Sequence, residues 1–85
     1  MINILMYTSQ FCPYCSNAER LLEDKGFKIT KKIYIDEDPE ELIKMKAATG
    51  KRTVPQIYIN DQYVGGYDDL RNIENSGELN KLLGI

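Results

Sequence analysis

The segment Cys12-Pro13-Tyr14-Cys15 decides how this chain folds, because it separates a short apolar run from a helical pattern. Residues 2–7 before it are mostly apolar, which is typical of a buried strand. Pro13 favours the first position of a helix, since its missing N–H is one that a helix leaves unpaired. Cys12 then falls at the N-cap, where the N–H groups of Tyr14 and Cys15 come within reach of its sulfur. The helix dipole favours a thiolate there, so we expect Cys12 to have a lowered pKa and to be the nucleophile.

The second cysteine has a different expected task. Cys15 lies one helical turn after Cys12, near enough to form a disulfide but more shielded, so we expect it to resolve mixed disulfides. The alternative is that both cysteines are small buried hydrophobic residues. The chain has two cysteines and no histidine. A secreted, disulfide-stapled fold would have more cysteines at wider spacings, and a structural zinc site would need two further cysteine or histidine ligands. The pattern favours redox chemistry, and we expect no metal.

The composition is that of an ordinary globular protein of small size. The chain has 85 residues, of which 42% are hydrophobic and 28% charged, and a net charge of −2. This charge balance gives no electrostatic reason for nucleic-acid binding, no apolar run is as long as a membrane span, and the first residues lack the features of a signal peptide. We therefore expect one monomeric, cytoplasmic domain over residues 1–85 that binds neither nucleic acid nor membrane.

The remaining segments alternate between helical and strand patterns. The helix from Pro13 should end at Gly26, with Phe27 closing back on Leu22 in a Schellman cap. Strands joined by that helix should be parallel, whereas two strands around a tight turn should be antiparallel. The expected class is α/β, a four-stranded mixed sheet with helices on both faces. A strand should follow over 27–35, and then a helix from Asp38 to Gly50 with Glu41 at capping-box spacing. Two strands over 56–59 and 62–64 should enclose a tight turn at Asn60-Asp61. Asp68 or Asp69 should open a short helix, and Ser76 should cap the last one.

Two further segments carry ligand-binding features. Thr53-Val54-Pro55 precedes a strand, and a cis proline there would leave the Val54 backbone able to pair with an extended, peptide-like ligand. The alternative is an ordinary proline at a strand start. In Gly65-Gly66-Tyr67-Asp68-Asp69 the glycines permit close backbone approach, and the helix start offers N–H groups to a carboxylate. The two aspartates could pair with an ammonium group or serve only as helix caps.

Taken together, residues 12–15, 53–56 and 65–70 resemble the glutaredoxin family in order and spacing over nearly the whole chain. The resemblance implies a thioredoxin fold, a cis Pro55 and an enzyme that reduces protein disulfides and glutathione mixed disulfides. Glutathione would be the reductant and co-substrate, and glutathione reductase an indirect partner. The implied catalytic residues are Cys12 and Cys15. The implied glutathione-binding residues are Tyr14, Thr53, Val54 (through its backbone), Pro55, Gly66, Tyr67, Asp68 and Asp69, the last three at the γ-glutamyl end.

Two positions depart from the family pattern. Glutaredoxins commonly have a lysine three residues before the nucleophilic cysteine, where it helps to hold the glycine carboxylate of glutathione, and this chain has Ser9 there. Lys51 or Arg52 could supply the charge, or both could be solvated surface residues. Family members often have cysteine where this chain has Tyr67, so this chain has no extra thiol outside the active pair.

Other functions share parts of this pattern. A thioredoxin would have tryptophan before the first cysteine, where this chain has Phe11. A glutaredoxin-like protein that receives electrons from thioredoxin reductase would have the same cysteine pair. Some glutaredoxins hold an iron–sulfur cluster between two subunits, and Pro13 argues against this by its resemblance to purely redox members. A catalytically inactive binding module is disfavoured because both cysteines are present.

Overall fold

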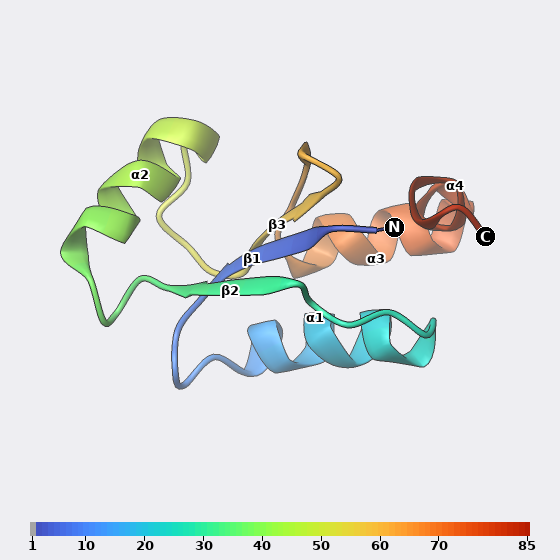
Figure 1. Cartoon of the computed structure of the whole chain (residues 1–85), viewed down its shortest axis with the longest axis horizontal. Helices are drawn as coiled ribbons and strands as arrows, with labels where there is room; N and C mark the ends of the chain where they lie inside the picture. The colour runs from blue at the N-terminus through green and yellow to red at the C-terminus, as the bar shows by residue number, and fades with distance from the viewer. Residues whose placement is uncertain (1) are drawn as a thin grey trace.

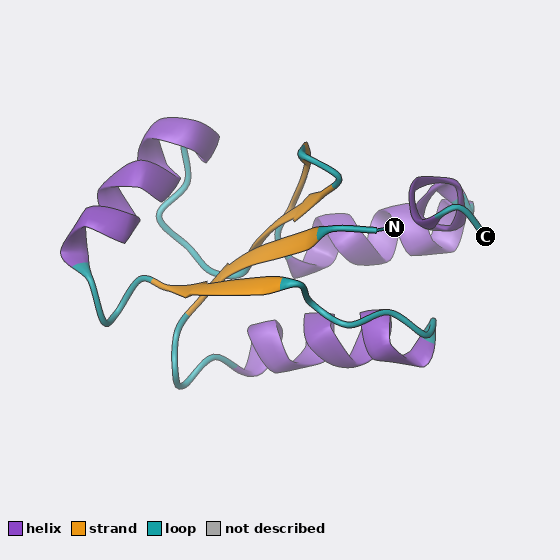
Figure 2. Ribbon diagram, in the orientation of Figure 1, coloured by secondary structure: helices purple, strands orange, loops and turns teal. Residues whose placement is uncertain are grey.

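The computed structural model describes residues 2–85, leaving Met1 of the predicted 1–85 domain outside the described residues. The predicted order of strands and helices is confirmed (Figures 1 and 2). The elements are β1 (Ile4–Thr8), α1 (Pro13–Asp24), β2 (Lys31–Tyr34), α2 (Pro39–Thr49), β3 (Gln56–Ile59), β4 (Gln62–Gly65), α3 (Tyr67–Ser76) and α4 (Glu78–Leu83).

The four strands form one mixed sheet in the order β2-β1-β3-β4. β1 and β2 are parallel, as expected for strands joined by a helix, whereas β3 is antiparallel to both β1 and β4. The β3–β4 turn uses Asn60 and Asp61, both with positive φ (50° and 68°), which is typical of a type I′ hairpin. The predicted fold class is therefore confirmed.

Helices lie on both sides of this sheet, with α2 on the opposite side from α1 (Figure 1). The main core combines β1 and β3 with α1, α3 and α4, and its side chains are almost fully buried. Its members are Ile4, Met6, Cys15, Ala18, Leu22, Ile57, Ile59, Leu70, Leu79 and Leu83. On β1, Leu5 and Tyr7 point to the other face and are half-buried. Cys15 therefore belongs to the core, which fixes α1 against the sheet.

The end of α1 confirms the Schellman cap and corrects the start of the next strand. The Phe27 N–H donates to the Leu22 carbonyl at 3.0 Å, and the Gly26 N–H donates to the Glu23 carbonyl at 2.8 Å. The predicted strand over 27–35 is wrong at its first residues, because β2 begins at Lys31. The Phe27 N–H is used by the helix cap and cannot join the sheet.

The predicted helix starts are correct at α2 and shifted at α3. Asp38 is the N-cap of α2, and its carboxylate accepts from the Glu40 N–H at 3.0 Å. The Glu41 carboxylate, predicted to complete a capping box, pairs instead with Lys44 at 3.3 Å. The N-cap of α3 is Gly66, not Asp68 or Asp69. The aspartates therefore lie in the first turn of α3, where their charge suits the helix dipole.

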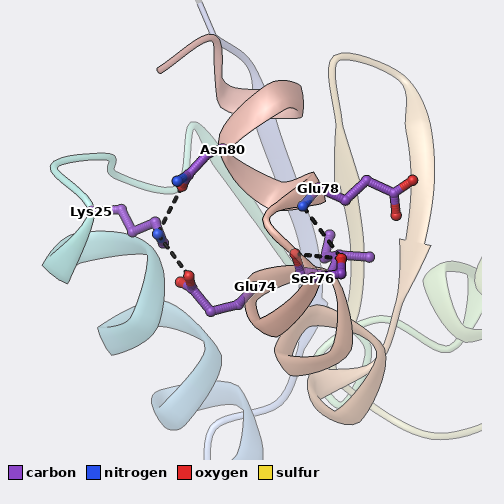
Figure 3. Close-up of polar contacts among 6 residues, drawn as sticks. Lys25, Glu74, Ser76, Glu78 and Asn80 are labelled. Carbon is purple, nitrogen blue, oxygen red and sulfur yellow. Dashed lines mark hydrogen bonds and ion pairs between the residues drawn. The ribbon is translucent and has the colours of Figure 1, made fainter.

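The start of α4 also differs from the prediction by one residue (Figure 3). Its N-cap is Gly77, because Ser76 is the last residue of α3. The Ser76 hydroxyl nevertheless accepts from the Glu78 N–H at 3.3 Å, so it satisfies a donor of α4 from one position earlier. Lys25 joins α1 to this corner, with its Nζ 2.7 Å from Glu74 Oε1 and 2.8 Å from Asn80 Oδ1. Among residues 2–85, no helix has the length and apolarity needed to cross a membrane.

Candidate active site

Cys12 occupies the N-cap of α1, as Pro13 predicted. Its Sγ accepts a hydrogen bond from the Cys15 backbone N–H at 3.2 Å, and the two cysteines are joined in a disulfide. Cys12 is half-buried, whereas Cys15 is only 4% exposed. Of the two N–H groups predicted to reach the sulfur, the one on Cys15 makes the hydrogen bond. The more accessible sulfur is thus also the one at the positive end of the helix.

The loop before β3 meets this cysteine pair. The Val54–Pro55 peptide bond is cis, as the resemblance implied. The Val54 carbonyl oxygen lies 3.7 Å from Cys12 Sγ, although 42 residues separate them in sequence. Within residues 2–85, neither the N–H nor the carbonyl of Val54 hydrogen-bonds to another backbone group. Both groups therefore remain able to pair with an extended ligand beside the sulfur.

All eight residues predicted to bind glutathione line one cleft of about 420 Å³. The cleft is formed by the first turn of α1, the loop before β3, and the start of α3, so the fold brings together segments that are distant in sequence. Its lining comprises Tyr14, Lys51, Thr53, Val54, Pro55, Gln56, Tyr63, Gly66, Tyr67, Asp68 and Asp69. A second cleft, of about 430 Å³, is lined by both cysteines.

The charges around the first cleft distinguish the two candidate cations. Lys51 lines this cleft, whereas Arg52 is absent from its lining, and Ser9 lines the second cleft instead. Asp68 and Asp69 line the same cleft as Lys51 and supply negative charge. Asp69 also caps α3, because its Oδ2 accepts from the Gly66 N–H at 2.9 Å. The cleft lining therefore combines a cation, two carboxylates and Val54, whose backbone groups make no hydrogen bond to other backbone groups of residues 2–85.

Two residues that hold this loop in place, Gln56 and Tyr63, were not predicted from the sequence. The Gln56 amide nitrogen donates to the Thr53 carbonyl at 2.9 Å, and its amide oxygen accepts from the Tyr63 hydroxyl at 2.5 Å. Gln56 is only 2% exposed, so these contacts satisfy a buried polar side chain. Burial, with a smaller contribution from the Asp69 carboxylate, raises the pKa of Tyr63. A glutamine inside the apolar strand Gln56–Ile59 was the available signal.

Two tyrosines that line the first cleft lie close together. The rings of Tyr14 and Tyr67 lie 6.2 Å apart between centroids, and the Arg71 guanidinium lies 5.9 Å from the Tyr67 ring. Tyr67 therefore packs where family members often have cysteine, and links α1 to α3. Among residues 2–85, no three histidine, cysteine, aspartate or glutamate side chains gather in a group suited to a metal ion.

Known proteins share this arrangement. The family model for glutaredoxin matches residues 4–64. The chain is 42% identical to a glutaredoxin of Neisseria meningitidis serogroup A over 83 residues, covering 98% of each chain. It is 40% identical to glutaredoxin 3 of Escherichia coli K12 over 83 residues, covering 98% of this chain and 99% of the relative. The chain belongs to the glutaredoxin family.

A solved glutaredoxin has the same fold. The solution structure of glutaredoxin from Brucella melitensis superimposes with a TM-score of 0.85 at 40% identity, covering 98% of this chain and 89% of that one. As a glutaredoxin, the protein is a thiol–disulfide oxidoreductase, and Cys12 and Cys15 are its redox pair. The disulfide seen here is the oxidised state of that pair.

Proposed function

We propose that this glutaredoxin reduces glutathione mixed disulfides and protein disulfides, with glutathione as its reductant. One observation carries the proposal: the eight residues expected to bind glutathione line a single cleft, and one of them, Val54, contacts the sulfur of Cys12. Glutathione is an extended tripeptide whose γ-glutamyl end carries an ammonium group beside one carboxylate and whose glycine end carries a second carboxylate. The cleft lining offers Asp68 and Asp69 to the ammonium group, Lys51 to the glycine carboxylate, and the Val54 backbone to the peptide groups between them.

The first reaction needs one cysteine. The Cys12 thiolate attacks the glutathione sulfur of a mixed disulfide, which forms a Cys12–glutathione bond and releases the substrate thiolate. A second glutathione thiolate then attacks the bound glutathione sulfur, so that glutathione disulfide leaves and Cys12 is free again. Glutathione reductase returns glutathione disulfide to two thiols, and is an indirect partner. The Cys15 N–H supports this role of Cys12 because its hydrogen bond favours a negative charge on sulfur.

The second reaction uses both cysteines. Cys12 attacks a protein disulfide, and the resulting mixed disulfide is released when Cys15 attacks Cys12 Sγ. Cys15 lies one helical turn away, so its effective concentration is that of an intramolecular partner. The cycle ends with the Cys12–Cys15 disulfide, which two glutathione thiols reduce. We infer a monomeric protein that acts in the reducing cytoplasm, where such a dithiol can turn over.

A coupled assay tests this function. The wild-type protein is mixed with glutathione, glutathione reductase, NADPH and the mixed disulfide of glutathione and 2-mercaptoethanol. NADPH consumption should depend on this protein and on glutathione. A parallel reaction replaces glutathione and its reductase by thioredoxin reductase. Activity in the thioredoxin reductase reaction alone would contradict glutathione dependence while leaving the thiol–disulfide chemistry intact.

A further inference from the structure

Phe11 is a large apolar side chain held in solvent beside the redox pair. It is 93% exposed, whereas the other exposed large hydrophobic residues of the described chain range from 40% to 65%. It neither joins nor packs on the hydrophobic core, and it lines neither of the two clefts beside the disulfide. The ring therefore contributes no burial to the fold. Single exposed apolar residues are common on protein surfaces, and Phe11 differs from them in lying next to the nucleophilic cysteine.

The backbone on both sides of Phe11 is fixed. The Gln10 N–H donates to Asp36 Oδ2 at 3.1 Å, and the Gln10 side-chain amide donates to Glu37 Oε1 at 2.9 Å. On the other side, Cys12 is the N-cap of α1 and is joined to Cys15. Phe11 is thus presented to solvent from a segment anchored to the β2–α2 turn and to α1.

The covalent intermediate brings a substrate to this ring. In a mixed disulfide, the Cα atoms of the two bonded cysteines are about 6 Å apart. The Cα atoms of Phe11 and Cys12 are about 3.8 Å apart because the two residues are adjacent in the chain. In the substrate, each residue next to the attacked cysteine is at the same Cα distance from that cysteine. A large side chain that flanks the attacked cysteine can therefore contact the Phe11 ring when it lies on the same side of the new bond. An aromatic ring gives much contact area for few rotatable bonds.

We propose that Phe11 selects protein disulfides in which a large apolar residue flanks the attacked cysteine. The inference rests on the proposed function, because it concerns the mixed disulfide between Cys12 and a protein substrate. Attack by the Cys12 thiolate forms this bond, and the second substrate sulfur leaves with the electron pair and takes a proton. Attack by Cys15 then releases the first substrate sulfur as a thiolate. The substrate gains two electrons, and the enzyme ends as the Cys12–Cys15 disulfide.

Single-turnover kinetics with two matched peptides test the inference. Each peptide contains one disulfide, and both of its cysteines are flanked by leucine in one peptide and by serine in the other. The protein is reduced beforehand and freed of reductant, so the assay needs no glutathione and stands apart from the coupled assay above. The compared proteins are the wild type, Phe11→Ser, Phe11→Leu, and Ile43→Ser, which removes an apolar residue that is 64% exposed on α2. The measured quantity is the ratio of the two second-order rate constants.

The wild type should reduce the leucine peptide about three to ten times faster than the serine peptide, since part of a phenylalanine surface is buried in the contact. Phe11→Ser should bring this ratio close to one, whereas Phe11→Leu and Ile43→Ser should keep the preference. Equal rates for the two peptides in the wild type would overturn the inference, as would a preference that survives in Phe11→Ser. Either result would leave glutathione dependence untouched.

Discussion

The hydroxyl of Tyr63 provides a test of how the cleft is held together. Tyr63→Phe removes one oxygen atom and leaves the ring in place. In the wild type this hydroxyl donates to the amide oxygen of Gln56, whose amide nitrogen in turn donates to the Thr53 carbonyl. The substitution thus removes a partner from a side chain that is 2% exposed and that holds the loop containing Val54. We expect both lower stability and weaker binding of the glutathione part of a substrate.

The magnitude follows from burial. An acceptor left unpaired in the interior costs about 1–3 kcal/mol. Tyr63 is 40% exposed and lines the cleft, so water can partly replace its hydroxyl, and we expect the lower half of that range, about 1–2 kcal/mol. For a chain of this length, such a loss lowers Tm by roughly 4–16 °C. A looser loop should raise KM for a glutathione mixed disulfide about two- to fivefold and change kcat less.

Urea denaturation and steady-state kinetics measure these effects. Tyr58→Phe is the matched control, because Tyr58 lies on the same hairpin with its ring 5.3 Å from that of Tyr63, and its hydroxyl makes no hydrogen bond within residues 2–85. The control should remain within about 0.5 kcal/mol of the wild type. Equal stability of the two variants would refute the assigned role of the Gln56 contact.

Alkaline pH gives an independent check on the same bond. The pKa of Tyr63 is raised in the folded state by burial and by Asp69. The folded state therefore favours the neutral phenol, and its stabilising contribution is complete below the unfolded pKa of about 10. The contribution is lost as the pH rises through the folded pKa. The stability difference between the wild type and Tyr63→Phe should accordingly shrink above about pH 10.

Two further substitutions, each compared with its chain neighbour, test the cation of the cleft and the backbone before α3. Lys51→Gln should raise KM for a glutathione mixed disulfide about two- to fivefold at low ionic strength and less in high salt, whereas Arg52→Gln should have little effect. Equal effects of the two substitutions would remove the reason for preferring Lys51. Gly65→Ala should lower the free energy of unfolding by about 1–3 kcal/mol, because φ is 120° at this position and a Cβ would overlap the Asp69 carboxylate. Gly66→Ala, where φ is −86°, should lower the free energy of unfolding by less. Urea denaturation measures both variants, and an equal loss of stability in the two would contradict the role given to the positive φ of Gly65.

The features that could be predicted from sequence are those whose cause is local. Pro13 places Cys12 at the N-cap without reference to the rest of the chain, and the Schellman cap at Gly26 depends on residues within two turns. Asn60 and Asp61 tolerate positive φ better than most residues, and both have positive φ in the β3–β4 turn. In the cleft, prediction relied on the resemblance to glutaredoxins, which supplied the residues that the fold then brings together.

The errors arise where local signals compete or where tertiary contacts decide. Phe27 has a strand pattern, yet its N–H closes a helix, so β2 starts later than predicted. The N-cap of α3 is Gly66, whose N–H donates to the Asp69 carboxylate. From the sequence, this arrangement could not be distinguished from one in which Asp68 or Asp69 is the N-cap. The glutamine at the start of an apolar strand marks Gln56 as unusual, but its partner Tyr63 lies on the other strand of a hairpin with an irregular register, so the sequence does not identify the contact.

The most direct test of the account compares Cys12→Ser with Cys15→Ser in two reactions. One reaction reduces a glutathione mixed disulfide, and the other reduces a protein disulfide by the dithiol route. Cys15→Ser should keep much of the first activity and lose most of the second, because only the second needs an internal thiol to release the substrate. Cys12→Ser should lose both, since Cys15 is 4% exposed and does not occupy the N-cap. Substantial activity of Cys12→Ser in either reaction would contradict the assignment of Cys12 as the nucleophile.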